Sequence, residues 1–379
     1  MPPKGKKGEK TMNIKKMKVF CASSLIFSLC LTVFAPIAQV GATEIGTSLT
    51  RDEGSGANPI VKAKWEANVD RYTDAATTAG AQFDPTGVYQ SNKTIAICAI
   101  VADPDGLSDI NKVYADVFYP VGIAVGEHHV KLDDQDGSEG AGCGLLMQED
   151  SLARLTKSEG YNLFCDSVKN HNNNLPTFED GYDYDEICAA DGELMKETAA
   201  VYCAEKDLSY EDPSGSYRTL ILAQDKSGKD GTLDNYFTYR PMTAFETDFS
   251  MISYGNVKLN THKIINGDLT WNVMDQGKAS VRNVGNTRLT MKVQQNDMGL
   301  GKTDGNWNVK YDGRVGSDAT FVKYDPEVTK ALNESLDLSE LNEMDFSIDI
   351  YKFPPEHGSS SYTGNMTLSA ASAAHLTCD

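Results

Sequence analysis

The sequence predicts a mainly β protein made of two β-sandwich domains, the first carrying a disulfide-tied α-helical insertion. Three observations support this fold class. Runs such as Ile95–Val101 are rich in β-branched residues and are bounded by turn residues. Between Leu145 and Glu205 the apolar spacing changes to that of helices. After the N-terminal segment described next, about 337 residues remain, which exceeds one comfortable core and favours two domains.

Residues 1–42 are interpreted as a secretory signal peptide with an N-terminal extension. Lys15, Lys16 and Lys18 precede the apolar run Val19–Ile37, and small residues follow up to Ala42, where a signal peptidase would cut. A retained membrane anchor is the alternative, but no charged stop-transfer cluster follows the run. We therefore expect a secreted or cell-surface protein with no stable membrane span after cleavage. Residues 43–57 are then a linker rich in Gly, Ser and Thr.

The charge of the chain narrows the possible partners. The full chain carries a net charge of −19, and removing residues 1–42 takes away seven lysines and one glutamate, which leaves −25. Such a charge opposes binding to nucleic acid or anionic lipid, and it favours solubility and cation binding.

Residues 58–254 are assigned to the first sandwich domain. Its expected strands are Pro59–Ala67, Ile95–Val101, Val113–Tyr119, Glu127–Leu132 and Tyr217–Ala223. Trp65 is expected to anchor the core. The turn Asp103-Pro104-Asp105-Gly106 follows the second strand, because Pro fixes φ, Asp caps locally and Gly accepts positive φ.

The helical insertion is placed at about residues 144–206. Apolar residues at helical spacing run from Leu146 to Val168, and a second helical run extends from Ile187 to Val201. The polar loop Asn170–Gly181 separates the two runs. β-structure is expected to resume only at Tyr217.

Six cysteines remain after cleavage, and an even number in an exported chain implies disulfides. Cys165 and Cys188 fall on neighbouring helices joined by a short loop, so we expect them to pair. Cys143 and Cys203 flank the insertion, and a bridge between them would close its neck. Cys98 and Cys378 are left over; either they pair across domains, or Cys378 is free or intermolecular. No C-x-x-C pair is present, which argues against a thiolate metal site.

Residues 255–379 are assigned to the second sandwich domain. Gly, Asn and Asp turns separate about seven short expected strands, which is the pattern of a Greek-key sandwich. These strands are Asn256–Ile264, Leu269–Met274, Ala279–Val284, Arg288–Gln294, Asn306–Tyr311, Asp345–Tyr351 and Tyr362–Ala370. A short turn or helix at Leu336–Met344 is expected to cross between sheets.

Three segments resemble immunoglobulin-like domains of prokaryotic, including archaeal, secreted cell-surface proteins. Val101–Ile110 looks like the first hairpin of such domains. Val281–Val293 is similar to the N-x-G-N strand pair of extracellular sandwich modules, and Gly358–Ala370 is similar to their last strand after a Gly/Tyr turn. The resemblance implies two immunoglobulin-like sandwiches in an extracellular setting. Such modules serve adhesion, surface layers, filaments and carbohydrate binding alike, so it does not choose among these roles.

Three acidic, glycine-bearing turns are candidate calcium sites, because calcium takes six to eight oxygens and such turns supply carboxylates and carbonyls together. They comprise Asp103 and Asp105 with Asp109; Asp133, Asp134 and Asp136 with Glu139; and the turn that begins at Asp225. None matches the full EF-hand spacing. The competing interpretation is that Asp and Gly are simply good turn residues.

Other motifs give no catalytic assignment. The run Phe178–Glu186 is dense in Asp, Glu and Tyr and is a candidate ligand or cation face, or the acidic N-terminus of a helix. His128 and His129 are adjacent in an expected strand and so point to opposite faces. No H-E-x-x-H, G-x-S-x-G or phosphate-binding loop is present, so no catalytic residue is predicted.

Asn92, Asn333 and Asn365 begin N-glycosylation sequons and are glycosylation candidates. Together these observations predict a non-enzymatic secreted or surface protein with a structural or adhesive role, as a surface-layer, sheath or filament component. Its expected partners are further copies of itself, other surface proteins or glycans, and not nucleic acid. The alternative is a secreted carbohydrate- or calcium-binding module, with calcium as its cofactor. A secreted hydrolase ranks third.

Overall fold

The computed structural model describes residues 56–75, 81–124, 143–172, 174–273, 278–354 and 361–378. The chain divides into two compact units, Met1–Thr50 and Arg51–Asp379, and all described residues belong to the second. The expected signal peptide, the linker up to residue 55 and the expected strand Glu127–Leu132 lie outside the described residues. Among the helices of the described part, none is both long and apolar enough to cross a bilayer.

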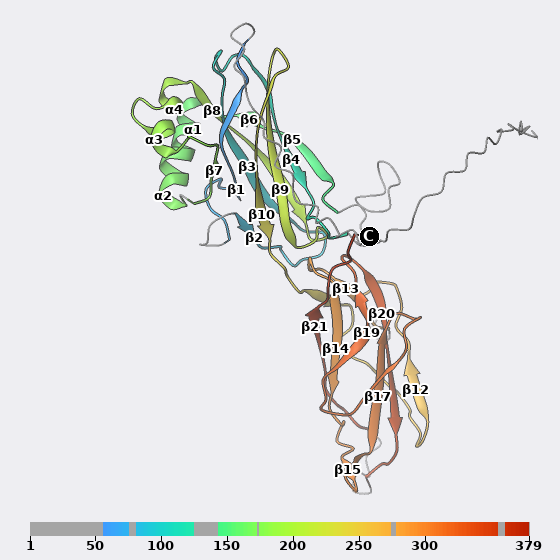
Figure 1. The fold of residues 1–379 in the computed structure, drawn as a ribbon. Coiled ribbons are helices and arrows are strands. Elements are labelled where there is room, and N and C mark those ends of the chain that lie inside the picture. The colour runs from blue at the N-terminus through green and yellow to red at the C-terminus, as the bar shows by residue number, and fades with distance from the viewer. Residues whose placement is uncertain are drawn as a thin grey trace, which may run out of the picture. The chain divides into compact units, whose positions relative to one another are not determined.

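The described chain is mainly β, and its first part folds as a β-sandwich of two five-stranded sheets (Figure 1). Sheet 1 has the order β6 (Ala153–Arg154), β8 (Ala199–Ser209), β3 (Asn92–Ala102), β1 (Ile60–Asn68) and β7 (Thr177–Phe178). Sheet 2 has the order β2 (Gln82–Phe83), β10 (Asp230–Tyr239), β9 (Gly215–Asp225), β4 (Ile110–Phe118) and β5 (Leu146–Ser151).

Sheet 1 is buried on both of its faces. Successive side chains of β1 point to opposite sides: Trp65 packs on Phe164 of the helical segment, with ring centroids 5.1 Å apart. Lys64 instead reaches sheet 2, where its Nζ donates to the carbonyl of Thr219 at 3.0 Å. This explains why Ile95–Val101 reads as a continuous apolar run and not as a strict alternation.

Five short helices cover the outer face of sheet 1 (Figure 1). They are α1 (Lys157–Tyr161), the π-helix η2 (Asn162–Val168), α2 (Lys169–His171), α3 (Tyr184–Cys188) and α4 (Glu193–Lys196). Thr156 and Glu159 form a capping box at the start of α1. A Cβ on the buried Gly160 would come within 3.1 Å of the Val201 side chain, so glycine lets α1 lie against β8.

The helical stretch is shorter than the sequence predicts. Helices were expected from Leu145 to Glu205, but Leu146–Ser151 and Ala199–Ser209 are strands. The first half of β8 is buried on both faces, so its apolar residues show no period of two. A short apolar run of this kind fits a buried helix and a buried strand equally well, so apolar spacing alone does not distinguish the two.

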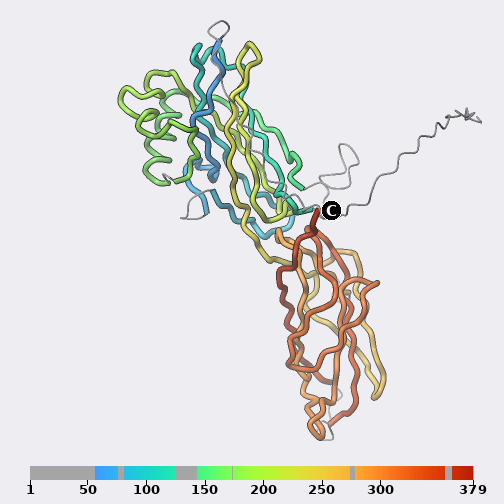
Figure 2. Tube along the Cα trace, in the orientation of Figure 1, coloured from blue at the N-terminus to red at the C-terminus, as the bar shows by residue number. Residues whose placement is uncertain are grey.

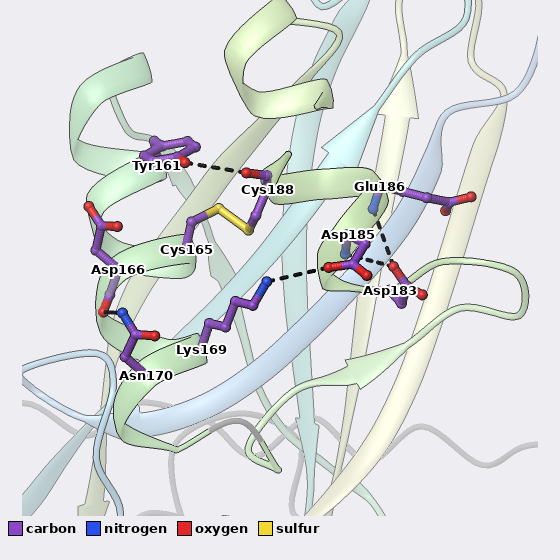
Figure 3. Close-up of a disulfide and its surroundings, with 9 residues drawn as sticks. All are labelled: Tyr161, Cys165, Asp166, Lys169, Asn170, Asp183, Asp185, Glu186 and Cys188. Atoms are coloured by element: carbon purple, nitrogen blue, oxygen red, sulfur yellow. Dashed lines mark hydrogen bonds and ion pairs between the residues drawn. A yellow bond between two sulfur atoms is a disulfide. The ribbon is translucent and has the colours of Figure 1, made fainter. Parts of the chain in front are cut away.

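A disulfide between Cys165 of η2 and Cys188 of α3 ties the helices together, as the sequence predicts (Figure 3). Two polar contacts flank it. The Tyr161 hydroxyl donates to the Cys188 carbonyl at 3.3 Å, and Lys169 pairs with Asp185 at 3.5 Å. Closing a loop of this length removes roughly 3 kcal/mol of chain entropy from the unfolded state.

The other two disulfides correct the expected pairing. Cys98 bonds to Cys203, and Cys143 bonds to Cys378. Cys98 and Cys203 lie directly opposite each other in the β3–β8 ladder, because the chain returns from the helices as a strand beside β3. Cys143 instead meets the last residues of the chain, where Ile123 forms an isolated bridge with Thr377.

The second sandwich is built by the gold-to-red part of the chain (Figure 2). Sheet 3 has the order β11 (Phe245–Thr247), β13 (Ser280–Asn283), β20 (Leu341–Ile350), β17 (Val309–Val315) and β18 (Val322–Tyr324), and β12 (His262–Ile265) also pairs with β20. Sheet 4 has the order β19 (Lys330–Leu336), β14 (Leu289–Gln295) and β21 (Met366–Ser372). A small hairpin joins β15 (Lys302–Thr303) to β16 (Asn306–Trp307).

The strands of the second sandwich differ from expectation at several points. β11 pairs with β13, so this sandwich begins ahead of residue 255. No strand forms at Leu269–Val273 in the described chain, while β18 and β19 were not expected. The Leu336–Met344 crossing is a turn of four residues, since β20 already begins at Leu341.

A buried ion pair sits between sheets 1 and 2. Lys64 Nζ lies 2.7 Å from Glu66 Oε1, and both side chains are fully buried. The Asn235 side chain bridges them, accepting from Lys64 and donating to Glu66 Oε2 at 3.1 Å. Burial lowers the pKa of Lys64, and the charge of Glu66 opposes that shift.

Replacing Lys64 by Met should destabilise the fold by about 3–5 kcal/mol, because it leaves the Glu66 carboxylate buried without its counter-ion. The double variant Lys64→Met/Glu66→Gln should recover at least half of that loss, since it removes the second charge and keeps an acceptor for Asn235. Urea unfolding followed by circular dichroism measures the free energy of unfolding of both variants. Equal losses in the single and double variants would show that the charge is not the cause.

His375 connects the last residues of the chain to the first sandwich. One of its ring nitrogens, Nε2, lies 2.8 Å from the Ser214 hydroxyl. Burial lowers the pKa of His375, and the Arg288 charge lowers it further. The folded state therefore disfavours the imidazolium, so this contact destabilises the fold as pH falls below the ordinary histidine value.

We expect wild type to lose more stability than His375→Gln when pH falls from neutral to below the lowered pKa of His375. In that window the unfolded chain binds the proton more tightly than the folded chain, so the free energy of unfolding decreases as pH falls. Melting temperatures of both proteins across pH 4 to 8 measure the difference. Parallel curves for the two proteins would contradict the assignment.

Candidate functional site

The structure brings two of the three predicted calcium turns together. Asp103 and Asp109 lie on the turn between β3 and β4, and Asp225 closes β9. The ladder places Ile110 opposite Asp225, so the two turns meet at one end of the sandwich. One carboxylate oxygen from each aspartate lies within 4.8 Å of the others. Asp105 stays exposed and lies outside this group, and Asp133, Asp134, Asp136 and Glu139 lie outside the described residues.

Each aspartate of the group has a different environment. Burial raises the pKa of Asp103, and the charges of Asp109, Asp105 and Asp225 add to the increase. Burial also raises the pKa of Asp225, but hydrogen bonds from Lys229 and Ser227 outweigh it and leave that pKa lowered. The backbone N–H of Lys229 donates to Asp225 Oδ1 at 2.8 Å.

A second carboxylate group was not anticipated from the sequence. His262 of β12 lies beside Asp349 of β20, with Nδ1 3.2 Å from Asp349 Oδ2, and its Nε2 is 3.9 Å from Asp312 Oδ2. The strand register brings this group together, because His262 pairs directly with Asp349. The two ring nitrogens face different carboxylates, which is the arrangement of an imidazole bridging two acids across the sheet.

The Phe178–Glu186 run has a structural role. Asp183 caps α3, and its Oδ1 accepts from the backbone N–H of Asp185 at 2.7 Å and of Glu186 at 3.2 Å (Figure 3). The Tyr184 ring stacks on Phe164 at 5.0 Å, and Lys62 lies over the Tyr182 ring. The acids therefore serve a helix N-terminus, and the tyrosines pack against neighbouring side chains.

The three sequon asparagines, Asn92, Asn333 and Asn365, are all exposed. Asn92 opens β3 and Asn333 lies on β19. Asn365 directly precedes β21 and lines the groove described next. Exposure makes each side chain available to a glycan.

A groove of about 1130 Å³ opens along the second sandwich, between residues 245–257 and the β21 edge. Its floor is formed by Ile348 and Ile350 of β20 with Leu300, and Phe353 and Tyr362 lie along it. The two aromatic rings stack at 5.6 Å. The sequence does not predict this groove, because its lining residues come from segments that lie far apart in the chain.

β21 is the outer strand of sheet 4 on the groove side. Its only ladder partner among the described residues is β14, so its other edge has no strand beside it there. The inward residues of β14 are fully buried, whereas Met366, Leu368 and Ala370 of β21 are only half-buried. Residues 250–257, which lie along the same groove, belong to no strand. The sandwich core is therefore incompletely covered at this edge.

Comparison with known proteins gives little guidance. No known protein family matches the chain, and no curated protein is significantly similar to it.

Several solved β-rich structures align with it weakly. A chain from the carbohydrate-binding modules of the β-sandwich superfamily is 8% identical, with 83% of this chain and 97% of that chain covered and a TM-score of 0.18. The C-terminal domain of the Streptococcus pyogenes antigen I/II-family protein AspA is 10% identical, with 84% and 97% covered and a TM-score of 0.22. A chain of the chaperone–tip adhesin complex of CFA/I fimbriae is 8% identical, with 86% and 94% covered and a TM-score of 0.21. At these TM-scores the likeness carries no argument about function.

Proposed function

We propose that the protein is a secreted structural or adhesive component of a cell surface, that it is not an enzyme, and that it associates with further copies of itself. Three disulfides in the described chain fit an oxidising, extracellular location.

The first domain is proposed to be immunoglobulin-like. β6-β8-β3-β1 faces β10-β9-β4-β5, which is the strand order of such sandwiches with the helices inserted between β6 and β8. Tyr217, near the start of β9, donates its hydroxyl to the Pro213 carbonyl four residues earlier, at 2.7 Å. This is the tyrosine corner of immunoglobulin-like domains.

The second domain is proposed to have the same arrangement with a shifted chain order. β20 pairs with β17, and β14 lies between β19 and β21. The last strand, β21, lies beside β14 as the first strand β1 lies beside β3, but β7 pairs with the other edge of β1, whereas β21 is an edge strand. This edge strand of sheet 4 is therefore one from near the end of the chain, and its inward side chains are only half-buried.

The observation that carries the proposal is the open edge of β21 beside the groove. An exposed edge presents unpaired backbone N–H and C=O groups, which template the addition of another strand. A strand of a second copy added there would pair with β21 and place alternate side chains over Met366, Leu368 and Ala370. If the added strand is a part of the chain other than β21, the contact is heterologous, and its repetition from copy to copy would build a filament or lattice because it need not close.

Self-association of residues 43–379 should depend on the groove side of β21. Leu368→Lys places a charge in the groove and should shift assembly to at least tenfold higher protein concentration, which corresponds to about 1.4 kcal/mol. Ser369→Lys puts the same charge on the exposed face of the same strand, leaves the Asn365 sequon intact, and should assemble like wild type. Sedimentation velocity at physiological salt measures the assembly of wild type and of the two variants.

Circular dichroism and the melting temperature test whether Leu368→Lys is folded. If it is not folded, Tyr362→Ala at the groove serves as the second variant. A wild-type chain that stays a monodisperse monomer at every ionic strength and concentration would contradict the proposal. Equal assembly of Leu368→Lys and Ser369→Lys would place the contact elsewhere.

The second candidate function is glycan binding in the same groove. The stacked Phe353 and Tyr362 rings favour it, because aromatic faces pack against the apolar face of sugar rings. A binding module of this kind should remain monomeric and be retained on a glycan array, and Tyr362→Ala should lose that retention. Retention of the wild-type monomer would favour this function over self-association.

A further inference from the structure

We propose that Asp103, Asp109 and Asp225 bind one calcium ion at the end of the first sandwich. The site is independent of the β21 groove, which belongs to the other sandwich. Its three carboxylates come from two turns that lie more than one hundred residues apart in the chain.

The spacing of the three oxygens fits a single ion. Calcium binds oxygen at about 2.3–2.6 Å, so two ligands on opposite sides of one ion are roughly 4.8 Å apart. The carboxylate oxygens of Asp103, Asp109 and Asp225 all lie within 4.8 Å of one another. They therefore fit in one coordination shell without movement of the backbone.

An independent observation points to a ligand at this position. The Asp103 side chain is 4% exposed. Its Oδ1 accepts the backbone N–H of Asp105 at 2.8 Å, whereas its Oδ2 is buried and has no hydrogen-bond partner in the described structure. A buried carboxylate oxygen without a partner costs free energy, so such atoms are rare unless something else satisfies them. A bound cation does so.

The local charge also favours a divalent cation. Asp103 and Asp225 are both buried, and Asp109 is half-buried beside them. Lys229 contributes a nearby positive charge to Asp225, but its Nζ also donates to the Gly56 carbonyl.

The donor set favours calcium over other metals. All three ligands are carboxylates, which hard cations prefer, whereas zinc and copper favour the nitrogen and sulfur of His and Cys. Magnesium demands near-ideal octahedral geometry at about 2.0–2.1 Å and keeps most of its water, while calcium tolerates irregular sets. Water molecules would complete the calcium shell.

Binding would fasten several parts of the first sandwich. The β3–β4 turn passes from sheet 1 to sheet 2, and the β9–β10 turn belongs to sheet 2, so one ion would link both sheets at this end. The same two turns hold the start of β1. Asp105 Oδ2 accepts the Ala57 N–H at 2.6 Å, and a Cβ on Gly231 would come within 1.9 Å of the Pro59 carbonyl oxygen.

Isothermal titration of calcium into chelator-treated residues 43–379 tests the site. Extracellular modules bind calcium with dissociation constants of about 0.1–1 mM, and we expect one site in that range. Asp109→Asn should weaken binding at least tenfold, whereas Asp230→Asn, at an exposed residue that begins β10 and lies outside the group, should leave it unchanged. Magnesium should compete weakly.

Asp103→Asn separates a calcium site from a merely structural cluster. It should raise the melting temperature of the metal-free protein, because it removes the unsatisfied buried charge and supplies an amide that can donate to its acidic neighbours. It should also abolish the rise in melting temperature that calcium gives wild type. No binding by wild type up to 10 mM calcium would overturn the proposal, as would calcium binding unchanged by both Asp103→Asn and Asp109→Asn.

Discussion

Sheet 1 is buried on both faces, and this constraint organises the first sandwich. A sheet so enclosed needs a cover on its outer side, which the helices between β6 and β8 supply through Phe164 packed on Trp65. The Cys165–Cys188 and Cys98–Cys203 disulfides hold that cover and the strands beneath it. Burial on both sides also encloses the Lys64–Glu66 pair, which persists because Asn235 and the Thr219 carbonyl satisfy its remaining polar atoms.

The core of the second sandwich is covered less completely. Its β14 is buried as fully as a central strand, but its β21 is covered on one side only, and residues 250–257 lie beside the groove without joining a sheet. The helices cover the outer face of sheet 1, whereas the half-buried strand β21 has no strand at its outer edge in the described part of the second sandwich. The proposed assembly follows from this asymmetry, and the Cys143–Cys378 disulfide joins the last residues of the second sandwich to the first.

Local features of this fold could be predicted from the sequence, and long-range ones could not. The strand at Ile95–Val101, the Trp65 anchor and the turn after Asp103 follow from β-branched, apolar composition and turn chemistry. The sequence predicts helix where β8 forms, because burial on both faces hides the period of the strand. Cys98 pairs with Cys203, and Asp225 meets Asp103 and Asp109, through ladder registers that no local pattern encodes. The groove depends on which sheet edges fail to meet, which is likewise a property of the whole fold.

We propose that a strand from another copy of the chain pairs with the open edge of β21. Hydrogen–deuterium exchange of residues 43–379 at low and high protein concentration tests it most directly, because it reports the backbone amides themselves. We expect the amides of Met366–Ser372 that point away from β14 to become protected only at high concentration, while those of the central strand β3 are protected at both. Protection of β21 that does not change with concentration, in a chain that is otherwise assembling, would contradict it.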